Sequence, residues 1–263
     1  MTSPSPSLAP AIRLSGLRKS FGAKTVLDGV DLEISEGRSL VIIGGSGSGK
    51  SVTLKCVLGL MAPDSGEIYI KGDCVTAMSA GERERVNRNI GMLFQGAALF
   101  DSLPVWENIA FGLIQGEGVS RDDARDIALE KLVAVGMKKE DADRNPSELS
   151  SGMQKRVGLA RAIAANPKIM FFDEPTTGLD PVMGDVINNL IVECVQELGA
   201  TALTITHDMA SARKISDRIA MLYQGKIIWT GDTSDIDHCG DAYVDQFIHG
   251  RIEGPIKTDL RLA

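Results

Sequence analysis

The chain has 263 residues, of which 43% are hydrophobic and 24% charged, and its formal net charge is −7. This length allows a full core in one large domain with subdomains, and the composition is ordinary for a globular protein. The negative charge and the lack of a basic face argue against a nucleic-acid partner. The four cysteines have neither paired nor metal-ligand spacing, which favours reduced thiols in a cytosolic protein.

Residues 1–10 contain no basic residue and no apolar segment, so they do not resemble a secretory signal. Their composition predicts a disordered leader. No run of the sequence approaches the ~18 apolar residues that a spanning helix needs. We therefore expect any membrane role to depend on a partner.

Strands are predicted within residues 11–43, where apolar and polar residues alternate from Ile12 and again from Val26 to Ile34. Residues 66–72 form a short alternating stretch, and residues 90–94 form an apolar one. These patterns predict an N-terminal antiparallel β subdomain followed by strands of a larger sheet.

The periodicity becomes helical from about residue 96 to residue 165, which predicts an inserted α-helical subdomain. Ser120 and Asp123 form a capping box, and Gly136 is a plausible helix end. The apolar stripe of this helix comprises Ala124, Ile127, Ala128 and Leu132.

Two strand–helix units follow, at residues 169–172 with 181–198 and at residues 201–206 with 208–215. Asp180-Pro181 is typical of a helix start, because aspartate caps the helix and proline suits its first turn. Apolar strands that alternate with helices indicate a parallel sheet buried on both faces. A hairpin is predicted around Gln224-Gly225.

A glycine-rich loop lies between the apolar run 40–43 and a helical segment that begins near Val52. Its residues are Gly44-Gly45-Ser46-Gly47-Ser48-Gly49-Lys50-Ser51. Glycines let successive backbone N–H groups turn toward phosphate oxygens, and the helix adds the positive end of its dipole. Lys50 supplies a cation for the β- and γ-phosphates, and Ser51 supplies a hydroxyl for Mg²⁺. The loop predicts a nucleoside triphosphate site on an α/β P-loop NTPase (RecA-like) core.

Two carboxylates, Asp173 and Glu174, follow the apolar run 169–172 directly. A buried strand would deliver both to its carboxyl end, where open α/β sheets bind ligands. Asp173 would hold Mg²⁺ through a water, and Glu174 would orient and polarise the attacking water. A solvated acidic turn is the alternative interpretation.

Together these motifs resemble the ATP-binding-cassette (ABC) ATPases over about residues 11–232. The segment 149–156 stands where that family has its serine- and glycine-rich signature, with Ser151 and Met153 departing from the Leu-Ser-Gly-Gly-Gln pattern. Ser150 and Ser151, which precede Gly152, are good helix caps, and Ser151 is small enough for close approach of a phosphate, although its Cβ could narrow the fit. A helix from about 153 to 165 would present its N-terminus to an anion. Without the other motifs the segment would be an ordinary capped helix.

The resemblance implies roles for four further residues. His207, otherwise a polar group at a strand end, matches the switch histidine that contacts the γ-phosphate. Gln95 matches the loop glutamine that touches Mg²⁺ and water and senses the transport subunit. Asp180 belongs to the loop that crosses between monomers, and Phe21 matches the adenine-stacking aromatic, although it is equally compatible with a core position.

One chain holds one phosphate loop and one signature, whereas the family clamps each nucleotide between the loop of one subunit and the signature of another. The resemblance therefore implies a head-to-tail dimer of two copies that closes over ATP and Mg²⁺.

The inserted helical segment carries no sustained heptads, unlike the coiled coils of the DNA-repair relatives, so a transporter subunit is favoured. Residues 94–108, Met153 and the continuation at 241–255 resemble the Mla and Mce-type lipid transporter ATPases. In the tail, Val244, Phe247 and Ile248 form a short stripe able to dock on a surface, and a frayed terminus is the alternative, especially for 256–263.

The resemblance thus implies an ATPase at the cytoplasmic face of a bacterial inner membrane that moves phospholipids between the inner and outer membranes. The implied partners are transmembrane permease subunits, a lipid-binding MCE protein and a small STAS-domain protein. An ATPase of an amino-acid or other small-solute transporter remains the alternative, and an ATP-binding regulator without turnover is a third. The expected domains are 11–240 for the ATPase, with the helical subdomain at about 96–165, and 241–263 for subunit contact.

We expect Lys50→Ala to abolish ATP binding, because the loop would lose its mobile cation for the phosphates. Isothermal titration calorimetry measures this directly, and unchanged ATP affinity would contradict the phosphate-loop assignment.

Overall fold

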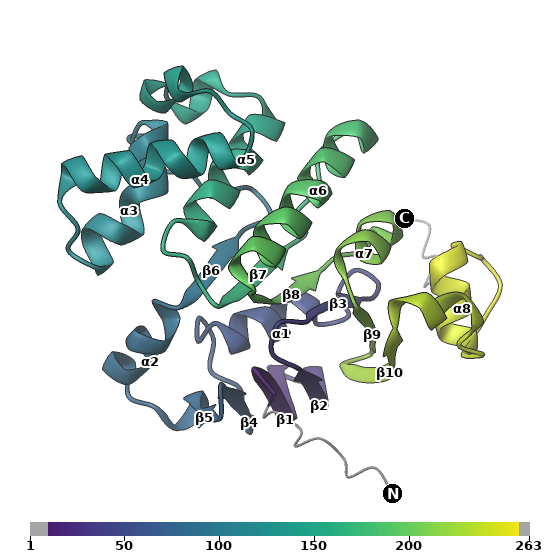
Figure 1. The fold of residues 1–263 in the computed structure, drawn as a ribbon. Coiled ribbons are helices and arrows are strands. Elements are labelled where there is room, and N and C mark those ends of the chain that lie inside the picture. The colour runs from purple at the N-terminus through teal and green to yellow at the C-terminus, as the bar shows by residue number, and fades with distance from the viewer. Residues whose placement is uncertain (1–9, 258–263) are drawn as a thin grey trace, which may run out of the picture.

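The computed structural model describes residues 10–257, so the predicted leader, apart from its last residue, and residues 258–263 lie outside the described part. Two sheets and several groups of helices make up the fold (Figure 1). The strands are β1 (Ile12–Phe21), β2 (Lys24–Ile34), β3 (Ser39–Ile43), β4 (Ser65–Ile70), β5 (Asp73–Cys74), β6 (Ile90–Leu93), β7 (Ile169–Asp173), β8 (Thr201–Ile205), β9 (Arg218–Tyr223) and β10 (Lys226–Asp232).

The larger sheet has the strand order β10-β9-β3-β8-β7-β6. Its central pairs are parallel, and β10 pairs with β9 as the predicted antiparallel hairpin. Leu40–Ile43 of β3 and all of β8 are buried, as expected for strands covered by helices on both faces. The predicted P-loop NTPase core is confirmed.

The smaller sheet is antiparallel, with the order β2-β1-β4-β5. Inward-facing residues of β1, such as Ile12, Leu14 and Leu17, pack with β2 and β4 in a core shared with α1 and with one face of the larger sheet. The alternation of the sequence therefore identified the buried face, and the predicted N-terminal β subdomain is confirmed.

The helices cover the larger sheet and extend away from it (Figure 1). The α-helices are α1 (Lys50–Val57), α2 (Ala80–Asn87), α3 (Val105–Gly116), α4 (Arg121–Ala134), α5 (Ser151–Ile163), α6 (Pro181–Leu198), α7 (Met209–Ile215) and α8 (Ala242–His249). Short 3₁₀ segments are η1 (Val75–Ala77), η2 (Lys139–Asp143), η3 (Pro146–Glu148) and η4 (Thr233–His238).

The predicted bounds hold for α6 and differ by one or two residues elsewhere. Helix α5 begins at Ser151 rather than at 153, because the Ser150 hydroxyl accepts a hydrogen bond from the Met153 amide and starts the helix earlier. The sequence analysis did not predict helix α2, because none of its residues is buried and it lacks an apolar stripe. Its capping box at Ser79 and Glu82 is the signal that identifies it.

Helices α3, α4 and α5 form the inserted group at the upper left of Figure 1. Ala124, Ala128 and Leu132 of the predicted stripe are fully buried, and Ile127 packs against the same core. Gly136 adopts φ +73°, which suits the residue just past a helix end.

Helix α5 lies unusually close to β6. A Cβ atom built on Gly91 would stand 2.2 Å from the Ala162 carbonyl oxygen, and one built on Gly158 would stand 2.9 Å from a Leu93 methyl. At Gly91 only glycine fits without a shift of the backbone, whereas at Gly158 the Leu93 side chain would have to move. The helix that carries the signature is therefore fixed against the strand that leads to Gln95.

The tail folds back on its own chain. Val244 is fully buried, Tyr243 and Phe247 pack against the main core, and the Tyr243 and Tyr223 ring centroids lie 5.1 Å apart. The Gln246 side chain accepts from the Ile256 amide at 2.7 Å and donates to the Ile256 carbonyl at 3.0 Å, which orders the segment after α8. The predicted stripe thus packs within the chain, and the subunit-contact role of residues 241–263 stays a prediction.

We predict that Gly91→Ala lowers the free energy of unfolding by about 1–3 kcal/mol, because the added methyl forces α5 away from β6. Urea unfolding followed by circular dichroism measures the change. Gly81→Ala in α2 is the matched control, since nothing lies within 4 Å of a Cβ there. An unchanged midpoint for Gly91→Ala would refute the close-packing argument.

Candidate active site

The phosphate loop links β3 to α1 and has no room for side chains at two positions. Gly44 adopts φ +154°, and a Cβ there would stand 2.3 Å from the Leu222 carbonyl oxygen. Gly49 adopts φ +111°, and its Cβ would meet Leu27 at 2.7 Å and the Val26 carbonyl at 2.9 Å. Glycine is required at both, so the backbone itself lines the loop. Gly49 caps α1 without a side-chain hydrogen bond, which leaves the first-turn amides for a ligand.

Lys50 is buried and its ammonium donates to the carbonyls of Gly44 at 2.6 Å and Gly45 at 3.1 Å. Burial lowers the pKa of Lys50, while the nearby carboxylates of Glu174 and Asp173 raise it. The Ser48 hydroxyl is buried without a hydrogen-bond partner, and Ser51 is exposed at the start of α1. A cradle of backbone amides, a buried cation and an unpartnered hydroxyl together fit a polyphosphate.

Asp173 ends β7 at the same sheet edge as the phosphate loop, because β8 runs parallel to both β3 and β7. One of its carboxylate oxygens is buried without a partner. Burial raises the pKa of Asp173, and the charge of Glu174 raises it further. An unpartnered carboxylate is the hard oxygen ligand that Mg²⁺ prefers.

No cluster of three or more His, Cys, Asp or Glu side chains suited to a metal occurs within residues 10–257. Mg²⁺ commonly keeps several waters and binds through one or two protein oxygens plus substrate phosphates. Asp173 and Ser51 fit this sparse donor set, so the residues present are compatible with Mg²⁺ bound together with a nucleotide.

Glu174 is held by donors from two directions. Its carboxylate accepts from the Thr206 hydroxyl at 3.1 Å and from the Thr177 hydroxyl at 3.2 Å, and His207 Nδ1 lies 2.9 Å from both oxygens. Its backbone adopts φ +46°, a left-handed conformation that is strained for a residue with a side chain. The structure thus brings Glu174 and His207 together, as expected of two residues that share a hydrolytic site.

The predicted signature caps α5 as expected. Gly152 is buried, and a Cβ there would stand 2.7 Å from the Met183 methyl, while Ser151 is exposed. Among the described residues, no hydrogen bond joins Ser150, Ser151 or Gly152 to the phosphate loop. Contact of the signature with a nucleotide stays a prediction.

Phe21 ends strand β1 and Asp180 immediately precedes α6, and both side chains are exposed. Phe21 is 48% exposed and pairs with Lys24, two residues before the Val26 carbonyl that approaches Gly49. An exposed ring beside the phosphate loop is not a core aromatic, which removes one of its two interpretations. The Asp180 carboxylate caps α6, accepting from the Val182 and Met183 amides at 3.0 Å each. Its contact with a nucleotide stays a prediction.

Two cations on α5 were missed by the sequence analysis. Lys155 is 4% exposed, and its ammonium donates to the Gln95 carbonyl and, at 3.4 Å, to the Glu174 carbonyl. Arg161 donates to the Ala98 carbonyl at 2.7 Å. The sequence signal that could have identified Lys155 is its position in the helix, because it falls on the buried face of α5 with Gly152 and Leu159.

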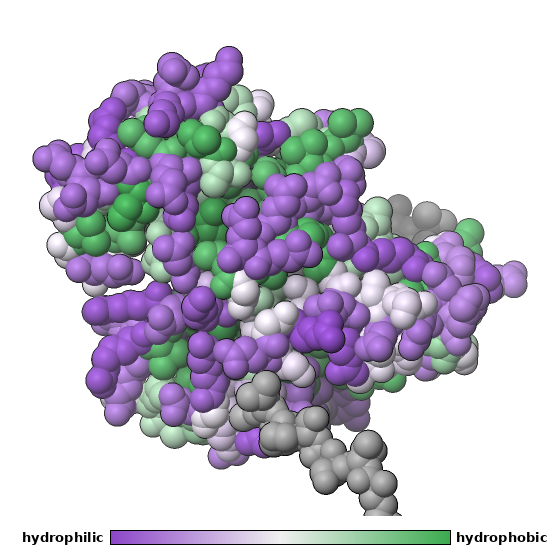
Figure 2. All heavy atoms as spheres, in the orientation of Figure 1, coloured by the Kyte–Doolittle hydropathy of each residue, from purple (hydrophilic) through white to green (hydrophobic). Residues whose placement is uncertain are grey.

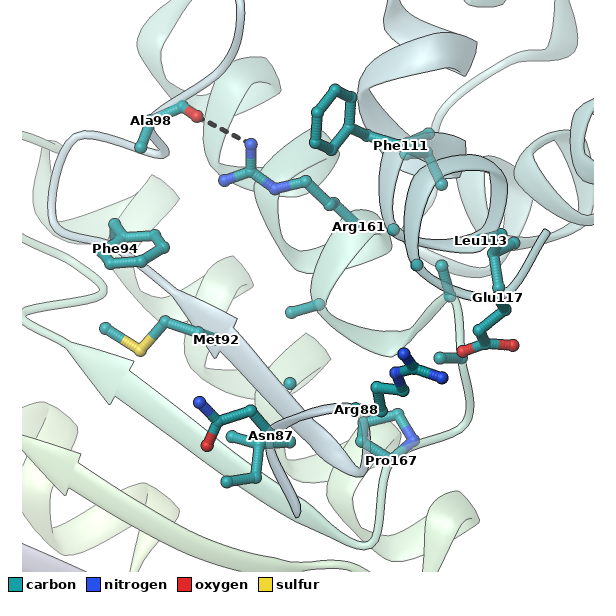
Figure 3. A pocket seen from close by; sticks show the side chains of 18 of the residues that line it. Asn87, Arg88, Met92, Phe94, Ala98, Phe111, Leu113, Glu117, Arg161 and Pro167 are labelled. Atoms are coloured by element: carbon teal, nitrogen blue, oxygen red, sulfur yellow. Dashed lines mark hydrogen bonds between the residues drawn. The ribbon is translucent and has the colours of Figure 1, made fainter. Parts of the chain in front are cut away.

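A groove of about 660 Å³ opens beside the loop that follows Gln95. It lies between β6, α3 and α5, and Phe94 and Phe111 stand on either side of Arg161 (Figure 3). Phe94, Phe100 and Phe111 are each at least 36% exposed. Figure 2 shows hydrophilic side chains over most of the visible face, with apolar atoms gathered between the helices.

A two-sheet P-loop fold, a glycine cradle and paired carboxylates at the sheet edge define a nucleotide-hydrolysing domain. The profile of the ABC transporter family matches residues 27–177, more than half of the chain. The chain belongs to this family and is an ATP-binding, ATP-hydrolysing subunit of an ABC transporter.

Several characterised proteins are similar to most of this chain. Protein TRIGALACTOSYLDIACYLGLYCEROL 3 of Arabidopsis thaliana is 40% identical over 91% of this chain and 73% of its own length. The intermembrane phospholipid transport system ATP-binding protein MlaF of Haemophilus influenzae is 35% identical over 94% of this chain and 93% of its own. The methionine import ATP-binding protein MetN of Carboxydothermus hydrogenoformans is 42% identical over 80% of this chain and 62% of its own.

A solved structure has the same fold. The ATP-binding cassette MJ0796, in a dimeric post-hydrolysis state bound to ADP and Pi, is similar with a TM-score of 0.77 and 34% identity. The similarity covers 84% of this chain and 98% of that one.

We predict that Glu174→Gln lowers steady-state ATP turnover by about a hundredfold or more, because the amide no longer accepts a proton from water. A phosphate-release assay measures turnover, and calorimetry verifies that ATP still binds. Turnover near that of the unaltered chain would exclude Glu174 as the general base.

Proposed function

We propose that the chain is the ATPase subunit of a bacterial inner-membrane transporter that moves phospholipids between the inner and outer membranes. The observation that carries this proposal is the similarity to MlaF over nearly the full length of both chains. Residues 94–108 and Met153, which resemble the Mla and Mce-type ATPases, support the same cargo. No helix among residues 10–257 is both long and apolar enough to cross a membrane.

The hydrolytic roles follow from the site. Lys50 and the loop amides hold the phosphates, with Phe21 stacking on adenine, and Glu174 takes the proton of the attacking water. His207, hydrogen-bonded to Glu174, orients that carboxylate and reaches the γ-phosphate. Mg²⁺ supplies positive charge to the transferring phosphoryl group and would be held by Ser51, Asp173 and Gln95.

We infer that two copies close head to tail, with Ser150, Ser151 and Gly152 of one copy facing the nucleotide of the other. The N-terminus of the signature helix carries the positive end of the helix dipole, which favours an anion. Val182, beside Asp180 at the start of α6, is 73% exposed, and an apolar side chain there favours contact with a second surface. The dimeric state of the similar cassette MJ0796 supports the same arrangement.

A permease subunit is the proposed occupant of the groove beside Gln95. Three exposed phenylalanines with a polar rim suit an amphipathic segment of a membrane protein better than water. Further proposed partners are a lipid-binding MCE protein and a small STAS-domain protein, with the complex at the cytoplasmic face of the inner membrane. We also propose that the segment after α8, where Ile252 is 93% exposed, contacts another subunit.

An amino-acid or other small-solute transporter is the second candidate. The specific observation in its favour is the 42% identity to a methionine import ATPase, although the similarity spans only 62% of that protein. The two candidates differ in the subunits and the ligand that accompany the chain.

The deciding experiment purifies the full chain from detergent-solubilised membranes and identifies its companions and bound lipid by mass spectrometry. An MCE protein, a permease and phospholipid are expected. A solute-binding subunit without phospholipid would replace the first candidate with the second.

We predict that Phe111→Lys weakens association with the permease by about 2 kcal/mol, roughly 30-fold in affinity, because a charge would enter the apolar groove. Quantitative co-purification measures the loss. Val133→Lys is the control, since Val133 is equally an exposed apolar residue of the helical group but does not line the groove. Equal recovery with both variants would argue against the groove as the docking site.

A further inference from the structure

A buried lysine of the signature helix α5 contacts the backbone at both Gln95 and Glu174. Lys155 lies one turn after Ser151 in α5 and is 4% exposed. Its ammonium donates to the carbonyls of Gln95 and Glu174, the latter at 3.4 Å. Burying an ammonium is unfavourable unless hydrogen bonds compensate, so these two carbonyls fix where the side chain lies.

At Glu174, Lys155 contacts a strained part of the backbone. At φ +46° the Glu174 amide donates to the Ile205 carbonyl at 2.9 Å, and its own carbonyl accepts from the Thr177 amide at 3.2 Å as well as from Lys155. A left-handed residue with a side chain persists only when its surroundings hold it there. Lys155 supplies one of those restraints from a different element of the fold.

The Gln95 end is a strained loop. Ala97 and Ala98 adopt φ +60° and +49°. Arg161, six residues after Lys155 on α5, donates to both of their carbonyls, at 2.5 and 2.7 Å. The loop backbone is therefore held by cations of one helix, and Lys155 differs from Arg161 in also reaching Glu174.

We propose that Lys155 is a positioning residue that holds Gln95 and Glu174 in register with the signature helix. The proposal rests on the roles proposed above for those two residues. Helix α5 also begins with the signature serines. The same helix would therefore position the signature and the hydrolytic side chains of its own subunit. Lys155 contributes no atom to the reaction and acts through two backbone carbonyls.

The test compares Lys155→Met, which is one atom shorter and removes every donor, with Lys155→Gln, which is of similar length to methionine and retains a neutral donor. For the methionine variant we expect kcat to fall about tenfold to a hundredfold, since small displacements of catalytic groups have effects of this size. KM for ATP and the calorimetric ATP affinity should stay within about threefold, because the phosphate loop is not altered. The glutamine variant should recover most of kcat.

Hydrogen–deuterium exchange gives a readout besides activity. Amides of residues 96–104 should exchange faster in Lys155→Met than in the unaltered full-length chain. Lys168→Met is the matched control, because Lys168 also donates to a backbone carbonyl, that of Leu198 at 3.2 Å, but lies outside the site. It should change neither kcat nor exchange in this loop.

The inference is overturned if Lys155→Met keeps its kcat, if the glutamine variant is no better than the methionine variant, or if KM rises as much as kcat falls. Equal losses with Lys168→Met, or a matching fall in the unfolding temperature, would also reduce Lys155 to a structural residue. Glu174→Gln, assayed in parallel, separates the two levels of the argument. If that variant retains turnover, the proposed site roles fail, whereas its loss beside a fully active Lys155→Met rejects only the inference about Lys155.

Discussion

The absence of space for a side chain in the phosphate loop is the constraint on which the rest of the structure depends. Gly44 lies against the carbonyl of Leu222 in β9, and Gly49 lies against Val26 in β2, so the loop touches both sheets. The antiparallel sheet and the parallel core must therefore keep one relative placement for the cradle to exist. Each further site group, from Asp173 to His207, is delivered to that cradle by a strand of the same parallel sheet.

The sequence was most informative where a pattern has a direct physical cause. Alternation identified the buried face of β1, and Asp180-Pro181 identified the start of α6. It was least informative about α2, which buries nothing, and about which surface the stripe around Val244 would meet. A short apolar stripe predicts burial but does not name its partner, and here that partner is the chain itself.

Within the candidate site, the sequence predicted residues with distinctive side-chain chemistry, and it did not predict residues whose contacts are to the backbone. The phosphate-loop motif predicted Lys50, the position after an apolar strand predicted Glu174, and the resemblance to the ABC ATPases added His207. Lys155 and Arg161 bind carbonyl oxygens, which every residue has, so the sequence holds no complementary signal for them. The left-handed backbone at Glu174 is likewise hidden, because it is not a glycine.

The buried, unpartnered oxygen of Asp173 has a consequence beyond catalysis. A carboxylate held away from water, with its pKa raised by burial and by Glu174, makes the folded chain less stable than a neutral group there would. A ligand that brings a compensating positive charge binds the folded state alone and shifts the folding equilibrium toward it. Chains without such a ligand are therefore closer to unfolding than chains that hold it.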